Sequence, residues 1–196
     1  DGANEVLSVM QIWLDTAPAD ANQLCGVTLR ENQAGEVLVG ITLQKPNMPL
    51  LQSLLTVLRK NIPGLIGVQY AMSSQRRGPM TQHRLWGESV IVEEFSGLLF
   101  SVDIVSFMQV NPEMAQQLYT LAFALGQIDR HETVLDLYSG VGTLTLLAAS
   151  QAKKAWGVEI VKSAVENARH NAARNRCRNA EFLLADAKDA FSLLRD

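Results

Sequence analysis

The feature that most constrains the fold is a hydrophobic run that ends in two glycines, Val-Leu-Asp-Leu-Tyr-Ser-Gly-Val-Gly at 134–142. The run predicts a buried strand, and the segment 143–149 after it predicts a helix. Gly140 and Gly142 permit a sharp turn and let a ligand approach the backbone without interference from a Cβ atom. Because open α/β sheets bind ligands at the carboxyl ends of their strands, this turn predicts a ligand site. The pattern also fits a tight strand-to-helix turn that binds nothing.

Strands and helices alternate through the second part of the chain. A helix is expected to begin at Asn111, a good N-cap, with Pro112 in its first turn. Its apolar stripe consists of Leu118, Leu121, Ala122 and Leu125. Strands are expected at 133–138, 155–159 and 180–185, and helices at 143–149 and 163–174. This alternation predicts a parallel sheet and an α/β fold class.

The first part of the chain has a different pattern. Strands are expected at 26–30 and 35–43, joined by a turn, and again at 65–70. A single amphipathic helix is expected at 50–60, and a second hairpin at 90–94 and 98–102. We therefore predict a small α+β, mostly antiparallel domain at 1–103, followed at 104–196 by the first half of a Rossmann-like domain.

Charge and cysteine content limit the possible functions. The formal net charge of −3 argues mildly against a surface dedicated to nucleic acid. Basic residues nevertheless cluster, and each cluster fits either RNA contact or a solvated surface: Arg76 and Arg77; His83 and Arg84; Arg169, His170, Arg174, Arg176 and Arg178. The two cysteines lie far apart and predict neither a disulfide nor a zinc site. This cysteine pattern fits a reducing cytoplasm, and no signal peptide or membrane span is indicated.

A carboxylate supports a nucleoside ligand at the glycine turn. Glu159 ends the next expected strand, near the offset of about 20 residues at which an acidic side chain accepts hydrogen bonds from ribose hydroxyls. The third glycine of the dinucleotide fingerprint is absent, because Thr145 occupies its position. The Asp-x-x-x-Gly-x-Gly pattern that begins at Asp136 instead resembles class I methyltransferases, in which this carboxylate orients the loop and helps to bind the cofactor's ammonium. Asp186 would face the adenine amino group, although its spacing fits a helix N-cap equally well.

Two motifs together resemble the RNA uracil-5 methyltransferases: Ser-Phe-Met-Gln-Val-Asn-Pro at 106–112, and Asp-Leu-Tyr-Ser-Gly-Val-Gly-Thr at 136–143. The resemblance covers nearly the whole chain, including Arg-Leu-Trp-Gly-Glu at 84–88. It implies S-adenosylmethionine as the cofactor, with Gln109, Tyr138, Thr143 and Glu159 in contact with it. With the residues above, the expected cofactor site comprises Gln109, Asp136, Tyr138, Gly140, Gly142, Thr143, Glu159 and Asp186. Phe107 and Gln109 are expected close to the target uracil, although core packing is an equal possibility for Phe107.

The same resemblance implies residues that this sequence lacks. In the family a cysteine thiolate adds to C6 of uracil, and a carboxylate near the C-terminus assists removal of the C5 proton. In the family the cysteine follows an Asp-Pro-Pro type motif and lies in a Ser-Cys-Asn-Pro type segment, and neither pattern occurs in this sequence. Both groups are therefore expected C-terminal to Asp196, and the chain alone is expected to be inactive. Cys177 fits a buried thiol better than a nucleophile, and Cys25 has no partner base. No metal site, iron–sulfur cluster or N-terminal RNA-binding barrel is indicated.

The function implied is methyl transfer from S-adenosylmethionine to C5 of uridine in RNA, with 23S ribosomal RNA favoured over transfer RNA by resemblance. Three alternatives stay open. The first is a class I methyltransferase that acts on transfer RNA, a protein or a small molecule. The second is a non-catalytic RNA-binding module, and the third is an oxidoreductase that prefers NAD.

Overall fold

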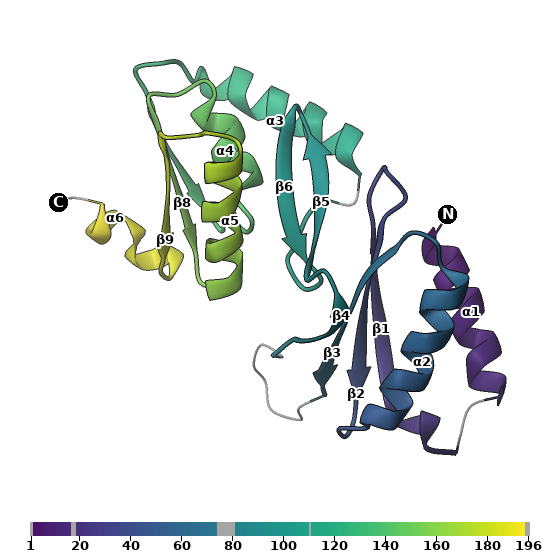
Figure 1. Cartoon of the computed structure of the whole chain (residues 1–196). Helices are drawn as coiled ribbons and strands as arrows, with labels where there is room; N and C mark the ends of the chain where they lie inside the picture. Colours follow the sequence, from purple (N-terminus) through teal and green to yellow (C-terminus); the bar gives the residue numbers. More distant parts are fainter. Residues whose placement is uncertain (1, 17–18, 74–80, 110, 195–196) are drawn as a thin grey trace. The chain divides into compact units, whose positions relative to one another are not determined.

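The computed structural model describes residues 2–16, 19–73, 81–109 and 111–194, and it forms two compact units, Asp1–Ile91 and Val92–Asp196. Both units combine helices with sheets, which confirms the α/β class (Figure 1). The division lies earlier along the chain than the predicted boundary at 103/104. Most of the second hairpin therefore belongs to the second unit.

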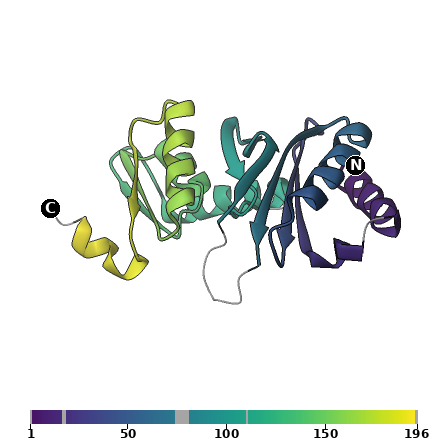
Figure 2. The ribbon, with the colours of Figure 1, turned by 60° about the horizontal axis from the view of Figure 1, so that its bottom comes forward.

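The first unit is a four-stranded sheet with two helices. Its elements are α1 (Gly2–Thr16), the 3₁₀ turn η1 (Ala19–Gln23), β1 (Leu24–Glu31), β2 (Val37–Leu43), α2 (Met48–Asn61), β3 (Leu65–Met72) and β4 (His83–Gly87). The strand order is β1-β2-β3-β4, and only the β2–β3 pair is parallel. Figures 1 and 2 show both helices on one face of this sheet. The mostly antiparallel pairing was predicted.

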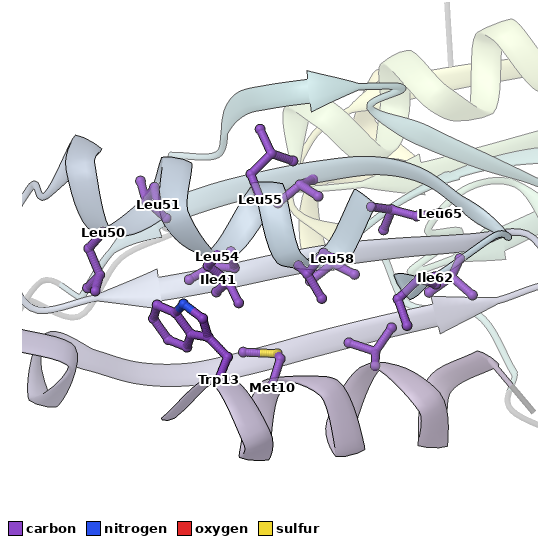
Figure 3. Close-up of a cluster of buried hydrophobic side chains, with 14 of the residues drawn as sticks. Met10, Trp13, Ile41, Leu50, Leu51, Leu54, Leu55, Leu58, Ile62 and Leu65 are labelled. Carbon is purple, nitrogen blue, oxygen red and sulfur yellow. The ribbon is translucent and has the colours of Figure 1, made fainter. Parts of the chain in front are cut away.

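The start and the buried face of helix α2 are both determined by the local sequence. The Asn47 side chain accepts a hydrogen bond from the Leu50 amide (3.0 Å), which caps the first turn. The leucines expected on one face are buried, among them Leu54 and Leu58, and they pack with Ile41 of β2 (Figure 3). The apolar periodicity thus identified the correct core face.

Helix α1 and strand β4 were not predicted, so the expectation of one helix in this part was wrong. Helix α1 buries Met10 and Trp13 in the same core (Figure 3). Its first turn is capped by a distant residue, because the Glu31 carboxylate at the end of β1 accepts hydrogen bonds from the amides of Gly2 (2.8 Å) and Ala3 (3.0 Å). These bonds lower the pKa of Glu31. A cap supplied by tertiary structure leaves no local signal.

The second unit contains most of the hairpin formed by β5 (Val90–Phe95) and β6 (Leu98–Asp103), and then a parallel sheet with helices. The further elements are α3 (Pro112–Gly126), β7 (Thr133–Leu137), α4 (Thr143–Ala149), β8 (Lys154–Glu159), α5 (Lys162–Arg174), β9 (Ala180–Leu184), η2 (Ala187–Asp189) and α6 (Ala190–Leu193). The sheet order is β7-β8-β9, and both pairs are parallel. The predicted alternation and parallel sheet are confirmed.

Helix α3 begins as predicted but buries a different face. The Asn111 side chain accepts a hydrogen bond from the Met114 amide (3.0 Å). The expected stripe of Leu118, Leu121, Ala122 and Leu125 is exposed. Instead, Ala115 and Phe123 are buried, and Phe123 packs against alanines of α4 and β8. Apolar residues lie on more than one face of this helix, so periodicity alone did not select the buried face.

None of the helices in the described part of the chain is long and apolar enough to cross a membrane.

Candidate functional site

Two segments far apart in sequence enclose a cavity of about 240 Å³ in the second unit. One wall follows β6, and the other is the turn from β7 into α4. The lining residues are Phe107, Met108, Gln109, Tyr119, Asp136, Leu137, Tyr138, Ser139, Gly140, Val141, Thr143 and Leu144. The structure therefore brings together six of the predicted site residues, Phe107, Gln109, Asp136, Tyr138, Gly140 and Thr143.

The turn after β7 has an unusual backbone. Tyr138, Gly140 and Gly142 all have positive φ angles, of 68°, 54° and 89°. The amides of Tyr138 and Ser139 both donate to the Val158 carbonyl, at 2.9 and 3.0 Å, which holds the turn against β8. A non-glycine residue with this backbone is strained, and such strain concentrates at functional sites. The Tyr138 side chain is 79% exposed, so burial of its ring does not compensate for the strain.

Gly140 and Gly142 are needed in this turn for different structural reasons. A Cβ atom on Gly142 would lie 2.8 Å from Cζ of Phe182, so this glycine permits close packing of the turn on β9. A Cβ atom on Gly140 would meet nothing nearer than the Phe107 carbonyl oxygen, at 3.9 Å. Gly140 therefore leaves open space beside the backbone, as a ligand that approaches the turn requires.

Glu159 connects the end of β8 to this turn. One carboxylate oxygen, Oε2, accepts a hydrogen bond from the Gly140 amide (3.0 Å). The other, Oε1, accepts from the amides of Ile160 and Val161, both at 2.8 Å. A carboxylate oxygen has more than one acceptor position, so Glu159 retains capacity for further donors. It does not line the cavity itself, but it is bonded to a residue that does.

Asp136 lies in the cavity wall and is only 7% exposed. Its Oδ2 accepts a hydrogen bond from the Thr145 hydroxyl at 2.6 Å. Burial raises the pKa of the Asp136 carboxyl, and the hydrogen bonds from Thr145 oppose that increase. Thr145 occupies the position of the third glycine in a dinucleotide fingerprint, and here it holds the Asp136 carboxylate beneath the turn.

The opposite wall presents an aromatic side chain and an amide. Phe107 is 72% exposed, so core packing is excluded for it, while its neighbours Ser106 and Met108 are buried. Burial raises the pKa of the Tyr119 hydroxyl, and the nearby Gln109 side chain opposes that increase. An exposed ring beside a polar cavity suits contact with a flat ligand.

Asp186 follows the end of β9. Its carboxylate accepts a hydrogen bond from the Lys188 amide (3.0 Å) and forms an ion pair with Lys188 Nζ (3.1 Å). These contacts lower the pKa of Asp186. It is not among the lining residues, and the N-cap alternative describes its observed contacts.

Neither cysteine lines this cavity. Cys25 is exposed in the first unit, and burial raises the pKa of the Cys177 thiol, which disfavours the nucleophilic thiolate. Within the described ranges, no group of three or more His, Cys, Asp or Glu side chains is placed to hold a metal ion.

The structure describes two of the three basic clusters, and both are exposed. Arg76 and Arg77 lie outside the described residues. His83 and Arg84 are exposed on β4, and the basic residues near α5 are also exposed. Among the latter, Arg169 donates a hydrogen bond to the Phe182 carbonyl (2.7 Å), which gives it a structural role as well.

Sequence reasoning missed Gly157 and Phe182, which support the turn from β8 and β9. A Cβ atom on Gly157 would lie 2.6 Å from the Phe182 ring and 2.8 Å from the Ser139 hydroxyl. A glycine within a strand often marks such a close approach, so Gly157 was a usable signal. Phe182 carried no comparable signal, because a buried aromatic in a strand is common.

The chain is similar in sequence to known methyltransferases. Residues 128–195 match a family described as a methyltransferase domain. The chain is 30% identical over 200 residues to an uncharacterized RNA methyltransferase of Clostridium acetobutylicum, with 96% of this chain and 44% of the relative covered. It is 35% identical over 161 residues to one of Lactiplantibacillus plantarum, with 80% and 35% covered. The chain thus spans less than half the length of these relatives.

Solved structures share the fold. The tRNA (uracil-54, C5)-methyltransferase of Pyrococcus abyssi, solved with S-adenosyl-L-homocysteine, superposes with a TM-score of 0.69 at 22% identity, over 95% of this chain and 47% of that one. A tRNA m1G37 methyltransferase of Methanocaldococcus jannaschii gives a TM-score of 0.53 at 18% identity, over 85% and 50%. At these identities the similarity concerns the fold.

Proposed function

Because the chain belongs to the class I methyltransferases that use S-adenosylmethionine and include RNA methyltransferases, we propose that its second unit binds S-adenosylmethionine and that the whole protein methylates C5 of a uridine in RNA. The observation that carries the proposal is the pair of cavity walls, with Phe107 and Gln109 opposite the glycine turn. A methyltransferase for RNA needs both a cofactor pocket and a surface that receives a base.

The residues of the turn fit the proposed cofactor. Open space beside Gly140 admits a ligand, and Glu159 has acceptor capacity for ribose hydroxyls. Tyr138 and Thr143 would contact the cofactor from the turn, and Asp136 would attract its ammonium from the buried wall. S-adenosylmethionine supplies an electrophilic methyl group when bound. We also propose that the Asp186 carboxylate faces the adenine amino group while it caps η2.

Phe107 supports a nucleic-acid base as the methyl acceptor. Single-stranded RNA bases stack on exposed aromatic rings, and enzymes that modify a base take it out of its helix. The exposed ring of Phe107 and the amide of Gln109 suit stacking and hydrogen bonding, respectively. The choice of C5 of uridine draws on the 106–112 motif, and a solved structure that shares the fold is a uracil-C5 enzyme.

Ribosomal RNA is the substrate class we propose, and transfer RNA is the second candidate. The first choice comes from family resemblance. The second is favoured by structural similarity to enzymes whose names specify tRNA. Neither Cys25 nor Cys177 lines the cavity. The relatives contain further sequence that this chain does not cover, and we propose that the nucleophilic cysteine and the catalytic carboxylate lie there.

The test is release of tritium from RNA labelled at C5 of uridine, with the full-length protein, S-adenosylmethionine, and ribosomal or transfer RNA in separate reactions. We expect release from ribosomal RNA and its loss in Glu159→Ala. Glu181→Ala is the matched control, since the Glu181 side chain forms an ion pair with Lys154 (2.8 Å) and does not line the cavity.

Several results would contradict the proposal. Binding of S-adenosylhomocysteine without tritium release from either RNA would remove the C5 assignment. Tritium release that survives Phe107→Ala and Gln109→Ala would exclude these two side chains from binding the base. Preferential binding of NAD would favour an oxidoreductase.

A further inference from the structure

Helix α5 lies beside strand β6 (Figure 1). Asparagines at four-residue intervals along this helix and at its end bond to alternate residues of the strand. The pairs are Asn167 with Asp103, Asn171 with Ser101, and Asn175 with Leu99. Four residues of helix rise about 6 Å and two residues of strand about 6.6 Å, so the two repeats match over this length. We call these three pairs the asparagine ladder.

Two of the pairs replace a neighbouring strand. The Asn171 side chain accepts from the Ser101 amide (2.7 Å) and donates to the Ser101 carbonyl (3.2 Å). Asn175 makes the same two contacts with Leu99, at 2.9 and 2.7 Å. Asn171 is fully buried. Each asparagine thus satisfies both backbone groups of one β6 residue, as a paired strand does.

The ladder reaches both walls of the candidate cofactor cavity. Asn171 also donates to the Val141 carbonyl in the glycine turn (3.0 Å). Asn167 donates to Oδ2 of Asp103 (3.0 Å). The other oxygen of Asp103 accepts from the amides of Val105 (3.0 Å) and Ser106 (2.6 Å), immediately before Phe107. One helix therefore holds the turn on one side and the start of the opposite wall on the other.

We propose that Asn167 and Asn171 are positioning residues that set the separation of the two cavity walls, and with it the affinity for the cofactor. The inference rests on the proposed cofactor and does not depend on the identity of the RNA. Neither asparagine lines the cavity, so each acts through the backbone that it holds.

The test uses Asn167, because Asn171→Ala would leave three buried backbone groups without partners and endanger folding. Asn167→Asp places a second carboxylate against Asp103 and removes the donor. We expect the dissociation constant for S-adenosylhomocysteine to rise about tenfold, and the Val105 and Ser106 amides to exchange with solvent about tenfold faster. Calorimetric titration and amide exchange by NMR measure the two effects.

An exchange of partners provides the rescue. In the double variant Asn167→Asp/Asp103→Asn, the new amide at 103 donates to the new carboxylate at 167, and its oxygen still accepts from Val105 and Ser106. We expect affinity and exchange rates to return close to those of the unchanged protein. Asn179→Ala is the control, since the Asn179 side chain donates to the carbonyls of Ala149 (2.8 Å) and Ala152 (3.2 Å) at and just after the end of α4 and does not line the cavity. It should lower stability and leave the dissociation constant unchanged.

The proposal is overturned if Asn167→Asp alters neither affinity nor exchange, or if the double variant fails to restore them. If the unchanged protein does not bind S-adenosylhomocysteine, the cofactor assignment fails. The amide exchange rates still decide whether the asparagine ladder holds the cavity wall that follows β6. No RNA is present in these measurements, so a failure of the uridine-C5 proposal is a separate result.

Discussion

At the scale of the residue, Tyr138 combines a strained backbone with an exposed ring. A non-glycine residue in the left-handed region costs about 1–2 kcal/mol, and glycine removes this cost. Glycine also loses more entropy on folding, by about 0.5–1 kcal/mol. Tyr138→Gly should therefore change the unfolding free energy by less than about 1 kcal/mol, in spite of losing a whole aromatic side chain.

The same substitution should raise the dissociation constant for S-adenosylhomocysteine about tenfold, because the ring that we place against the cofactor is lost. Urea unfolding and calorimetric titration test the two parts. Tyr138→Ala loses the ring and keeps the strain, so it should be less stable than Tyr138→Gly and bind equally weakly. Unchanged affinity in both variants would remove Tyr138 from the site.

Asp136 is the second residue for which stability and binding should diverge. Its folded pKa is raised by burial, so its ionised form disfavours the fold. This cost is absent below the unfolded pKa of an aspartate, about 3.9, and grows as the pH rises from there to the folded pKa. Asp136→Asn, which still accepts from Thr145, should therefore exceed the unchanged protein in melting temperature at pH 7 but not at pH 3.

The affinity of Asp136→Asn for S-adenosylmethionine should fall about tenfold or more at pH 7, since a charged partner for the ammonium is lost. Melting curves at the two pH values and titration with the cofactor provide the measurements. A melting temperature below that of the unchanged protein at pH 7 would mean that the carboxylate stabilises the fold.

At the scale of the element, the register of the parallel sheet supports the turn. Asp136, Gly157 and Phe182 lie side by side across β7, β8 and β9. The Phe182 ring extends over Gly157 and reaches Gly142, and both glycines leave room for it. The central strand thus carries no side chain at the point where the aromatic ring packs.

Gly157→Ala should destabilise the second unit by about 1–3 kcal/mol, because its Cβ atom would overlap the Phe182 ring. Denaturant unfolding followed by circular dichroism measures the change. A second substitution, Phe182→Leu, should recover part of the loss by making room. If Gly157→Ala alone is neutral, the ring moves at little cost and is not what holds the turn.

At the scale of the whole molecule, every predicted cofactor residue lies in the second unit, whereas the core around Leu58 lies in the first. Leu58→Ala should lower the stability of the first unit by about 2–5 kcal/mol, because it leaves a cavity in a fully buried position. Affinity for S-adenosylhomocysteine should stay the same at a temperature where both units are folded.

Differential scanning calorimetry measures the stability of each unit, and calorimetric titration measures the affinity for S-adenosylhomocysteine. Leu146→Ala is the matched variant, since Leu146 is fully buried in α4 of the second unit and follows the glycine turn. It should reduce stability and affinity together. A loss of affinity in Leu58→Ala would show that the two units are energetically coupled.

Local sequence alone determined the fold class, the parallel sheet, helix α2 and the glycine turn. These features depend on short-range physics: apolar periodicity, side-chain caps such as Asn47 and Asn111, and the backbone freedom of glycine. The cavity also brought together residues selected from sequence, with Phe107 and Gln109 opposite Tyr138 and Gly140.

Tertiary structure alone decided the rest, because these features need partners that are distant along the chain. Helix α1 is capped by Glu31 of β1, and the buried face of α3 depends on what packs against it. The exposure of Phe107 and the capping role of Asp186 were open alternatives until their surroundings were known. The asparagine ladder is the clearest case, since an asparagine in a helix shows no sign of the strand that it will satisfy until the two elements lie side by side.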